Sequence, residues 1–224
     1  SYPDNVLVIR LDAQDGPLSF TLRPTIPFEQ SYMETKGDGL SKKGTVTSSV
    51  EYGIGCIELS GTLGYYDVDF VGYYRVYTTG GTMVADTVEH KYTDRDGTQK
   101  TDLDGVIRVE GATSAIIVAT FGTDYELSEE NFKNGQYSHN KQTAKTNLDD
   151  AREKVQDQLY MVTDEIDSMS VDEAYDYLKS RHIADYDGLF GRVDLDLNCN
   201  EEDYQLTTDE LLDKYNSGVH SSYL

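Results

Sequence analysis

The sequence predicts a mainly β protein with an α-helical appendage, in which an antiparallel β-sandwich is followed by linker helices. Two observations carry this prediction. Up to about residue 121, short runs rich in Val, Ile, Thr and Tyr alternate apolar and polar residues, with turn residues at regular intervals between them, which is typical of a sandwich. Beyond that residue, apolar residues recur at steps of three and four, which is the spacing of amphipathic helices.

The first two strands are expected on either side of the turn at Asp15-Gly16-Pro17, and we expect them to form a hairpin. Residues 5–11 (NVLVIRL) form an apolar run typical of a buried strand, and residues 18–24 (LSFTLRP) end at a proline. Residues 30–43 are polar and contain glycine, so they predict a long surface loop.

Six further runs predict the remaining strands. In sequence order they are GTVTSSVEY, GCIELSG, YYDVDFVGYYRVYT, TMVADTVEH, GVIRVEG and SAIIVATFG. In the third run, Gly72 predicts a bulge or bend at which the register of the strand shifts. Gly80 and Gly81 predict the turn into the fourth run.

Residues 147–169 predict the first long helix, with Asn147 as its N-cap. Its single apolar stripe consists of Leu148, Ala151, Val155, Leu159, Val162, Ile166 and Met169. The next helix begins at the Ser-x-x-Glu capping box of Ser170 and Glu173 and ends near Gly188.

A third helix is expected to be short. It begins at a Thr-x-x-Glu box, Thr207 to Glu210, and ends before Gly218. With the change of composition near residue 122, these signals divide the chain into a β-sandwich region (1–124), a helical linker region (125–190) and a strand with a short helix (191–224).

The composition excludes some classes of partner. The formal net charge is −22 over 224 residues. Such a charge repels phosphate backbones and anionic lipid surfaces, so we expect no nucleic-acid partner and no membrane partner. No apolar run approaches the roughly 20 residues of a membrane-spanning helix.

The sequence assigns no catalytic, cofactor-binding or metal-binding residue. The four histidines are scattered and lack the spacing of helical metal ligands; they are His90, His139, His182 and His220. His182 lies near Asp185 on a helix, which more often makes a local hydrogen bond than a catalytic pair. Cys56 has the flanks of a small buried side chain and Cys199 those of an exposed one, and their pairing is left open.

Two further patterns each allow two interpretations. The segment 94–105 carries Asp-x-Asp-Gly twice, which suggests calcium, although the positions of a full calcium loop are not filled and hairpin turns explain the motif better. A tyrosine cluster suggests a platform for stacking sugar rings, whereas half-buried strands also favour tyrosine. The cluster consists of Tyr65, Tyr66, Tyr73, Tyr74 and Tyr77.

The segment 182–197 (HIADYDGLFGRVDLDL) resembles the linker that joins the N-terminal β-sandwich to the helical catalytic barrel in glycoside hydrolase family 95. The opening SYPDNVLVIR and the following LSFT resemble strands of that sandwich, as do GGT at residue 80, VEGA at residue 109 and IIVA at residue 116. TTDEL at residue 207 resembles the segment leading into the barrel. The segments 30–43 and 147–169 look long for the family.

The resemblance implies that the chain is part of a large sandwich with its linker, in an enzyme that hydrolyses terminal α-L-fucosyl or related α-galactoside-type linkages with inversion. It places the catalytic residues in the barrel, outside these 224 residues. It also implies a bacterial protein located outside the cell or on its surface, with a fucosylated glycan as substrate and no cofactor. The alternative is a carbohydrate-binding or adhesive sandwich without activity.

Two kinds of protein contact are expected. Tyr186, Leu189 and Phe190 are spaced to contact one neighbouring surface, which the resemblance identifies as the sandwich or the barrel. An exposed sheet edge also predicts an edge-paired homodimer of the chain.

Overall fold

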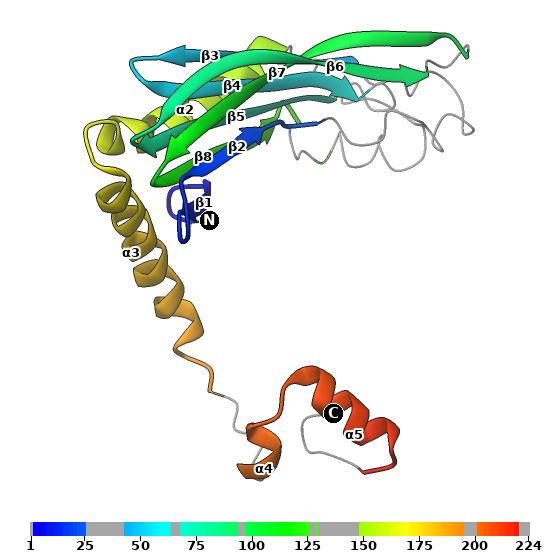
Figure 1. Ribbon diagram of the computed structural model, residues 1–224, viewed down its shortest axis with the longest axis vertical. Coiled ribbons are helices and arrows are strands. Elements are labelled where there is room, and N and C mark those ends of the chain that lie inside the picture. Colours follow the sequence, from blue (N-terminus) through cyan, green and yellow to red (C-terminus); the bar gives the residue numbers. More distant parts are fainter. Residues whose placement is uncertain are drawn as a thin grey trace. The chain divides into compact units, whose positions relative to one another are not determined.

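The computed structural model describes residues 2–25, 43–63, 68–93, 97–125, 129, 148–194 and 201–219 (Figure 1). The mainly β prediction is confirmed, because the described residues form eight antiparallel strands in two sheets, with helices toward the C-terminus. The chain divides into two compact units, Ser1–His182 and Ile183–Leu224. The first contains both sheets.

The larger sheet has five strands in the order β1-β8-β5-β4-β3. Their bounds are β1 (Leu7–Asp12), β8 (Ser114–Thr123), β5 (Val68–Thr79), β4 (Ile54–Leu63) and β3 (Lys43–Glu51). The smaller sheet has the order β2-β7-β6, with β2 (Leu18–Leu22), β7 (Gln99–Ala112) and β6 (Thr82–Thr93).

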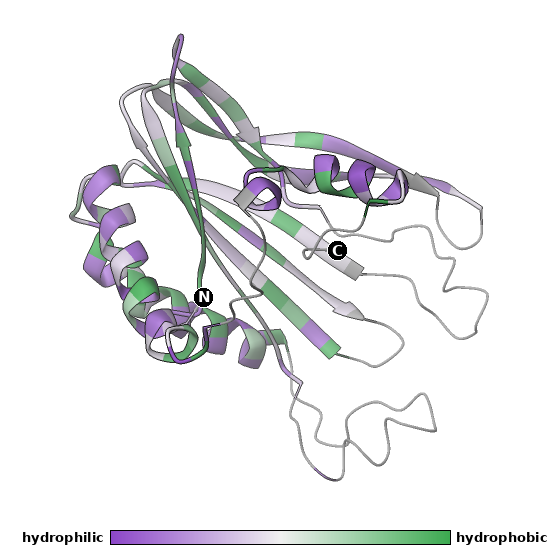
Figure 2. Ribbon diagram, turned by 90° about the horizontal axis from the view of Figure 1, so that it is seen from below, coloured by the Kyte–Doolittle hydropathy of each residue, from purple (hydrophilic) through white to green (hydrophobic). Residues whose placement is uncertain are grey.

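Apolar side chains that alternate with polar ones along the strands form a hydrophobic core between the two sheets. Buried side chains from both sheets contribute to it, namely Val46, Ile57, Leu59, Val76, Ile107, Val109, Ala112 and Ile117. The alternation of hydrophobic and hydrophilic residues can be followed in Figure 2. The sheets therefore pack face to face as a sandwich.

A helical layer covers the opposite face of the larger sheet. The stripe predicted for α2 (Leu148–Ile166) is confirmed, since its buried apolar residues are Ala151, Val155, Leu159, Val162 and Ile166. With α3 (Val171–Phe190), they pack on strand residues such as Tyr77, Ile116 and Val118. Ser114 to Thr120 of β8 are consequently all buried, because this strand has a neighbour on both faces.

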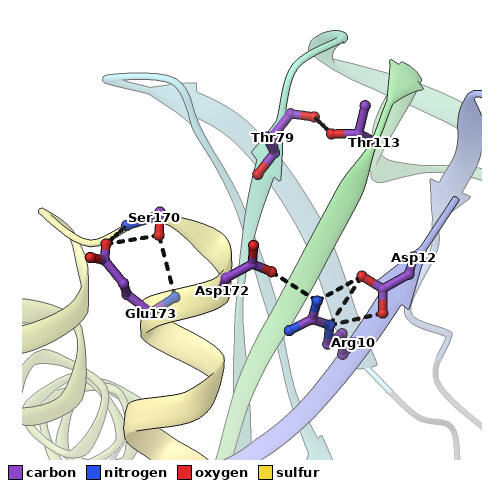
Figure 3. Close-up of polar contacts among 7 residues, drawn as sticks. All are labelled: Arg10, Asp12, Thr79, Thr113, Ser170, Asp172 and Glu173. Atoms are coloured by element: carbon purple, nitrogen blue, oxygen red, sulfur yellow. Dashed lines mark hydrogen bonds and ion pairs between the residues drawn. The ribbon is translucent and has the colours of Figure 1, made fainter.

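At one end of the sandwich the chain makes two of its changes of sheet close together, from β5 to β6 and from β7 to β8. It leaves β5 through Gly80 and Gly81, whose φ angles of +69° and +73° suit glycine, and it returns from β7 to β8 at Thr113. The Thr113 hydroxyl donates to the carbonyl oxygen of Thr79 at 3.0 Å (Figure 3). The Thr113 backbone N–H donates to the same oxygen at 2.8 Å. These bonds tie the two crossings together.

The predicted hairpin of the first two strands is wrong. β1 pairs with β8 and β2 pairs with β7, so the turn after β1 carries the chain from one sheet to the other. β1 is an edge strand and not a buried one, with Leu7 52% and Ile9 42% exposed.

The predicted register shift at Gly72 is also wrong. The pairing of β5 with β4 and with β8 continues through Gly72 without interruption. A Cβ at this position would lie 2.8 Å from the Phe121 ring, so the glycine makes room for an aromatic side chain on the neighbouring strand.

The second unit contains the end of α3, α4 (Glu201–Tyr204) and α5 (Thr208–Asn216). The predicted capping box of α5 is confirmed, since Thr207 donates from both its backbone nitrogen and its hydroxyl to Glu210, each at 2.9 Å. Lys214 of α5 forms an ion pair with Asp203 of α4, whose side chain is 1% exposed. α3 extends to Phe190 and not only to Gly188, and the described part of the predicted strand, residues 191–194, is a turn and irregular chain.

Several predictions fall outside the described residues. They concern residues 30–42, Tyr65, Tyr66, Asn147, His139, His220 and Cys199, together with the first Asp-x-Asp of the segment 94–105.

Candidate functional site

The start of α3 is fixed by the predicted capping box, which is confirmed. The Ser170 backbone N–H and hydroxyl donate to Glu173 Oε2 at 2.9 and 2.8 Å, and the Glu173 backbone N–H donates to the Ser170 hydroxyl at 3.3 Å (Figure 3). These bonds lower the pKa of Glu173, with the bond from the Ser170 backbone as the largest cause. The helix therefore begins at a defined residue.

Arg10 joins this first turn to strand β1. Its guanidinium donates to Asp12 on the same strand and, at 2.8 Å, to Asp172 on α3 (Figure 3). The Tyr175 ring lies under the same guanidinium, with 4.9 Å from the Arg10 Cζ to the ring centroid. The hydrogen bond from Arg10 lowers the pKa of the Asp12 carboxyl.

A second arginine joins α3 to the beginning of the chain. Arg181 donates to both carboxylate oxygens of Asp4, the shortest bond being 2.8 Å, and its Cζ lies 5.4 Å from the centroid of the Tyr177 ring. Asp4 has a side chain that is only 13% exposed, so the pair is shielded from solvent on one side. Between Asp172 and Arg181, α3 is thus held on the sandwich by two arginines.

The last part of α3 and the residues just after it carry an exposed apolar surface, which we call the junction stripe. It consists of Ile183, Tyr186, Leu189, Phe190 and Val193, which are 43 to 74% exposed. The Tyr186 and Phe190 rings stack, with centroids 5.1 Å apart. The sequence placed Tyr186, Leu189 and Phe190 on one surface, and contiguous exposed apolar residues of this kind mark contact sites.

Other residues singled out in the sequence are distributed over the fold. His182 is exposed on α3. Cys56 is a free thiol on β4, and burial raises its pKa. Within the described ranges, no group of three or more His, Cys, Asp or Glu side chains is arranged to hold a metal ion. No helix in the same ranges is both long and apolar enough to cross a membrane.

The second Asp-x-Asp-Gly motif lies inside strand β7 and not in a loop. Asp104 is 9% exposed, and its Oδ2 accepts bonds from Arg23 at 3.1 Å and pairs with Nδ1 of His90 at 2.9 Å. The Arg23 guanidinium thus compensates the charge of the carboxylate that the calcium interpretation would require as a ligand.

Tyr73, Tyr74 and Tyr77, the described members of the tyrosine cluster, do not form a platform, because they lie on different faces of β5. Tyr73 and Tyr77 face the helices, and Tyr74 faces the other sheet. On that face the Tyr74 ring meets the Phe121 ring of the adjacent strand β8 edge to face. The Tyr77 hydroxyl donates to Asp167 at 2.7 Å. The half-buried strand interpretation of these tyrosines is therefore the correct one.

A polar groove that was not predicted from the sequence lies beside α2. It has a volume of about 420 Å³ and is lined by residues of β3, β4, β5 and α2, among them Glu58, Tyr73, Arg75 and Gln156. Its residues come from three strands and one helix, so no short motif could have indicated it. We call it the α2 groove.

Comparison with known proteins bears on the C-terminal part of the chain. Residues 174–224 match the family model described as the glycosyl hydrolase family 95 catalytic domain. This segment includes most of α3, the junction stripe and α5. No curated protein matches the chain. The family match coincides with the junction whose residues carry the sequence resemblance, so residues 174–224 are similar to the family 95 glycoside hydrolases.

Proposed function

We propose that these 224 residues form the non-catalytic β-sandwich and linker portion of a family 95 glycoside hydrolase that removes terminal α-L-fucosyl or related α-galactoside-type residues with inversion. The observation that carries the family assignment is the match of residues 174–224 to the family 95 catalytic-domain model. The non-catalytic role and the specificity rest on the resemblance, which places the catalytic residues outside these 224 residues. A sandwich followed by linker helices is the arrangement that the resemblance implies, although α2 looks long for the family. A net charge of −22 is compatible with a neutral glycan substrate located outside the cell.

In this proposal the junction stripe packs on the helical barrel that carries the catalytic acid and base. Burying an exposed aliphatic or aromatic side chain contributes about 1.5 to 3 kcal/mol, so a surface of this composition is suited to an intramolecular interface. The two arginine pairs at Asp172 and Asp4 hold the preceding part of α3 on the sandwich. The role of the chain is then to support and position the barrel.

The activity assignment is tested by comparing two polypeptides on aryl α-L-fucoside and aryl α-galactoside. The 224-residue chain should show no turnover, and a longer polypeptide that includes the barrel should hydrolyse the fucoside with inversion at the anomeric carbon. Turnover by the 224-residue chain would overturn the non-catalytic assignment. A longer polypeptide active only on the galactoside would overturn the fucosyl specificity.

The packing role is tested with Phe190→Ser, because Phe190 is 62% exposed in the chain. The substitution should leave the unfolding midpoint of the 224-residue chain unchanged and should lower the midpoint or the kcat of the longer polypeptide. Asp187→Ser, an exposed polar position on the same helix, is the matched control. Equal effects of both variants in the longer polypeptide would contradict the packing role.

A further inference from the structure

The α2 groove is formed where the helical layer ends over the larger sheet. Strands β3, β4 and β5 provide its floor, and Gln156 and Tyr160 of α2 stand on one side. A volume of about 420 Å³ is in the range of sites that hold small molecules. Tyr160 is 46% exposed, so its ring is available at the rim.

The acceptor side of the groove is held in place by a hydrogen-bond network. Arg152 donates to Glu58 Oε1 at 2.8 Å, and the Tyr73 hydroxyl donates to Glu58 Oε2 at 2.9 Å. Gln156 in turn donates to the Tyr73 hydroxyl at 2.8 Å. A carboxylate has about four lone-pair positions, so Glu58 retains the capacity to accept bonds from a ligand while its orientation is fixed.

The donor side of the groove is Arg75 on β5. Its side chain is only 19% exposed, and its contact with a carboxylate is an ion pair of 3.6 Å to Asp167, which is too long for a hydrogen bond. Within the described ranges its guanidinium donates no hydrogen bond, although it carries five N–H groups. A mostly buried donor group of this kind is costly unless it finds acceptors, so it is available to a ligand.

The charged and polar side chains that line the α2 groove favour one class of ligand. Glu51 and Glu58 line the groove together with Arg75, and Asp167 pairs with Arg75, so an anionic ligand would be repelled by nearby carboxylates. Hydroxyl groups both donate and accept, and therefore satisfy Arg75 and Glu58 together. The Tyr160 ring offers an apolar face to the carbon skeleton of a ring.

We propose that the α2 groove binds one neutral polyhydroxylated ring, such as a monosaccharide unit, with Arg75 as donor, Glu58 as acceptor and Tyr160 as the stacking side chain. The site belongs to the sandwich and does not depend on the proposed hydrolase activity. Its test uses the 224-residue chain and measures no turnover, so its failure and the failure of the proposed function are distinguishable.

The test is saturation-transfer NMR of the whole chain with L-fucose, D-galactose, D-glucose and D-glucuronate. At least one neutral sugar should bind, and glucuronate should bind at least about tenfold more weakly, a difference of about 1.4 kcal/mol. Arg75→Met and Tyr160→Ala should each weaken binding about tenfold or more. Arg108→Met, which removes an exposed arginine of β7, is the matched control and should bind as the unmodified chain does.

A second measurement covers the case in which Arg75→Met fails to fold. Cys56 lines the groove, so a bound sugar should slow the alkylation of Cys56 in a Cys199→Ser variant. As a control, the same sugar should not slow the alkylation of a small free thiol compound. Failure of all neutral sugars to bind, preference for glucuronate, binding unaffected by both groove substitutions, or unchanged alkylation of Cys56 by a bound sugar would each overturn the proposal.

Discussion

A Cβ atom placed on Gly105 of β7 would lie 2.5 Å from the backbone nitrogen of Ser48 on β3. The two residues belong to different sheets, so the sandwich closes at this point through direct contact of two backbones. This contact explains the glycine of the second Asp-x-Asp-Gly motif, whose preceding Asp104 is buried beside Arg23 and His90. The motif serves the packing of the sheets.

Gly105→Ala is expected to destabilise the protein by about 2 kcal/mol or more, because neither backbone can move without disturbing its own sheet. The measurement is the urea midpoint of unfolding. Gly16→Ala is the control, since a Cβ at Gly16 meets nothing within 4 Å and should change stability by less than about 0.5 kcal/mol. Equal effects of the two substitutions would contradict the close approach of β7 and β3.

Asp104 gives the second prediction. Asp104→Ala removes the acceptor shared by Arg23 and His90 and should cost about 2 kcal/mol, because both partners are partly buried. Since the Arg23 guanidinium already compensates the charge of this carboxylate, the unfolding temperature of the unmodified chain should be the same in calcium and in EDTA. A calcium-dependent rise that Asp104→Asn abolishes would restore the calcium interpretation.

The sequence predicted what depends on neighbouring residues and missed what depends on distant ones. The alternation in the strands, the stripe of α2 and the capping boxes at Ser170 and Thr207 are local signals, and each corresponds to an observed element. The partner of β1 is β8, more than 100 residues later, and nothing in the turn after β1 distinguishes a hairpin from a change of sheet. The α2 groove was missed for the same reason.

Gly72 shows how a local signal can mislead. A glycine within a strand suggests a bulge, but here the reason for it is the Phe121 ring on the adjacent strand, which only the pairing of β5 with β8 reveals. The environment of each tyrosine of β5 likewise could not be predicted without the strand pairing, because it depends on whether the helices or the other sheet cover that side chain.

Tyr77 leads to a pH-dependent prediction. Burial, and then the hydrogen bond to Asp167, raise the pKa of Tyr77 above that of an unfolded chain, which is about 10. The stabilisation is fully present below that pH and is lost as the pH rises toward the folded-state pKa, because the unfolded chain releases its proton first. Stability should therefore fall above about pH 10.

Tyr77→Phe should cost about 1 kcal/mol at neutral pH through the lost hydrogen bond and should reduce the fall in stability above pH 10. Urea unfolding from pH 8 to 11 measures both effects. Tyr52→Phe is the control because Tyr52 is fully exposed. If the free energy of unfolding of Tyr77→Phe falls with pH as steeply as that of the unmodified chain, Tyr77 does not titrate as described.

The attachment of α2 to the sheet is tested with two isoleucines. Ile166 is 0% exposed in the helical layer, whereas Ile183 is 43% exposed on α3. Ile166→Ala should cost about 3 kcal/mol, and Ile183→Ala less than about 0.5 kcal/mol, in urea unfolding. If Ile166→Ala lowered the free energy of unfolding no more than Ile183→Ala does, the packing of α2 on the sheet would be contradicted.

The edge of the larger sheet gives the last prediction, an antiparallel pairing of β1 with β1 of a second copy. If Ile9 faces Ile9 of the partner, Leu7 lies opposite Leu11 and Val8 opposite Arg10. One face then carries a continuous apolar stripe, and no like charges lie directly opposite each other. Leu7 and Ile9 are the exposed residues that this pairing would cover. The edge is therefore self-complementary.

Light scattering should give twice the chain mass of 25.1 kDa at micromolar concentration. Ile9→Lys places two positive charges opposite each other at the two-fold axis, so this variant should be a monomer. Val84→Lys, a 53% exposed position on the edge strand of the other sheet, should remain a dimer. A monomer mass for the unmodified chain would rule out the pairing. If only Val84→Lys produced a monomer, the dimer contact would lie at β6 and not at β1.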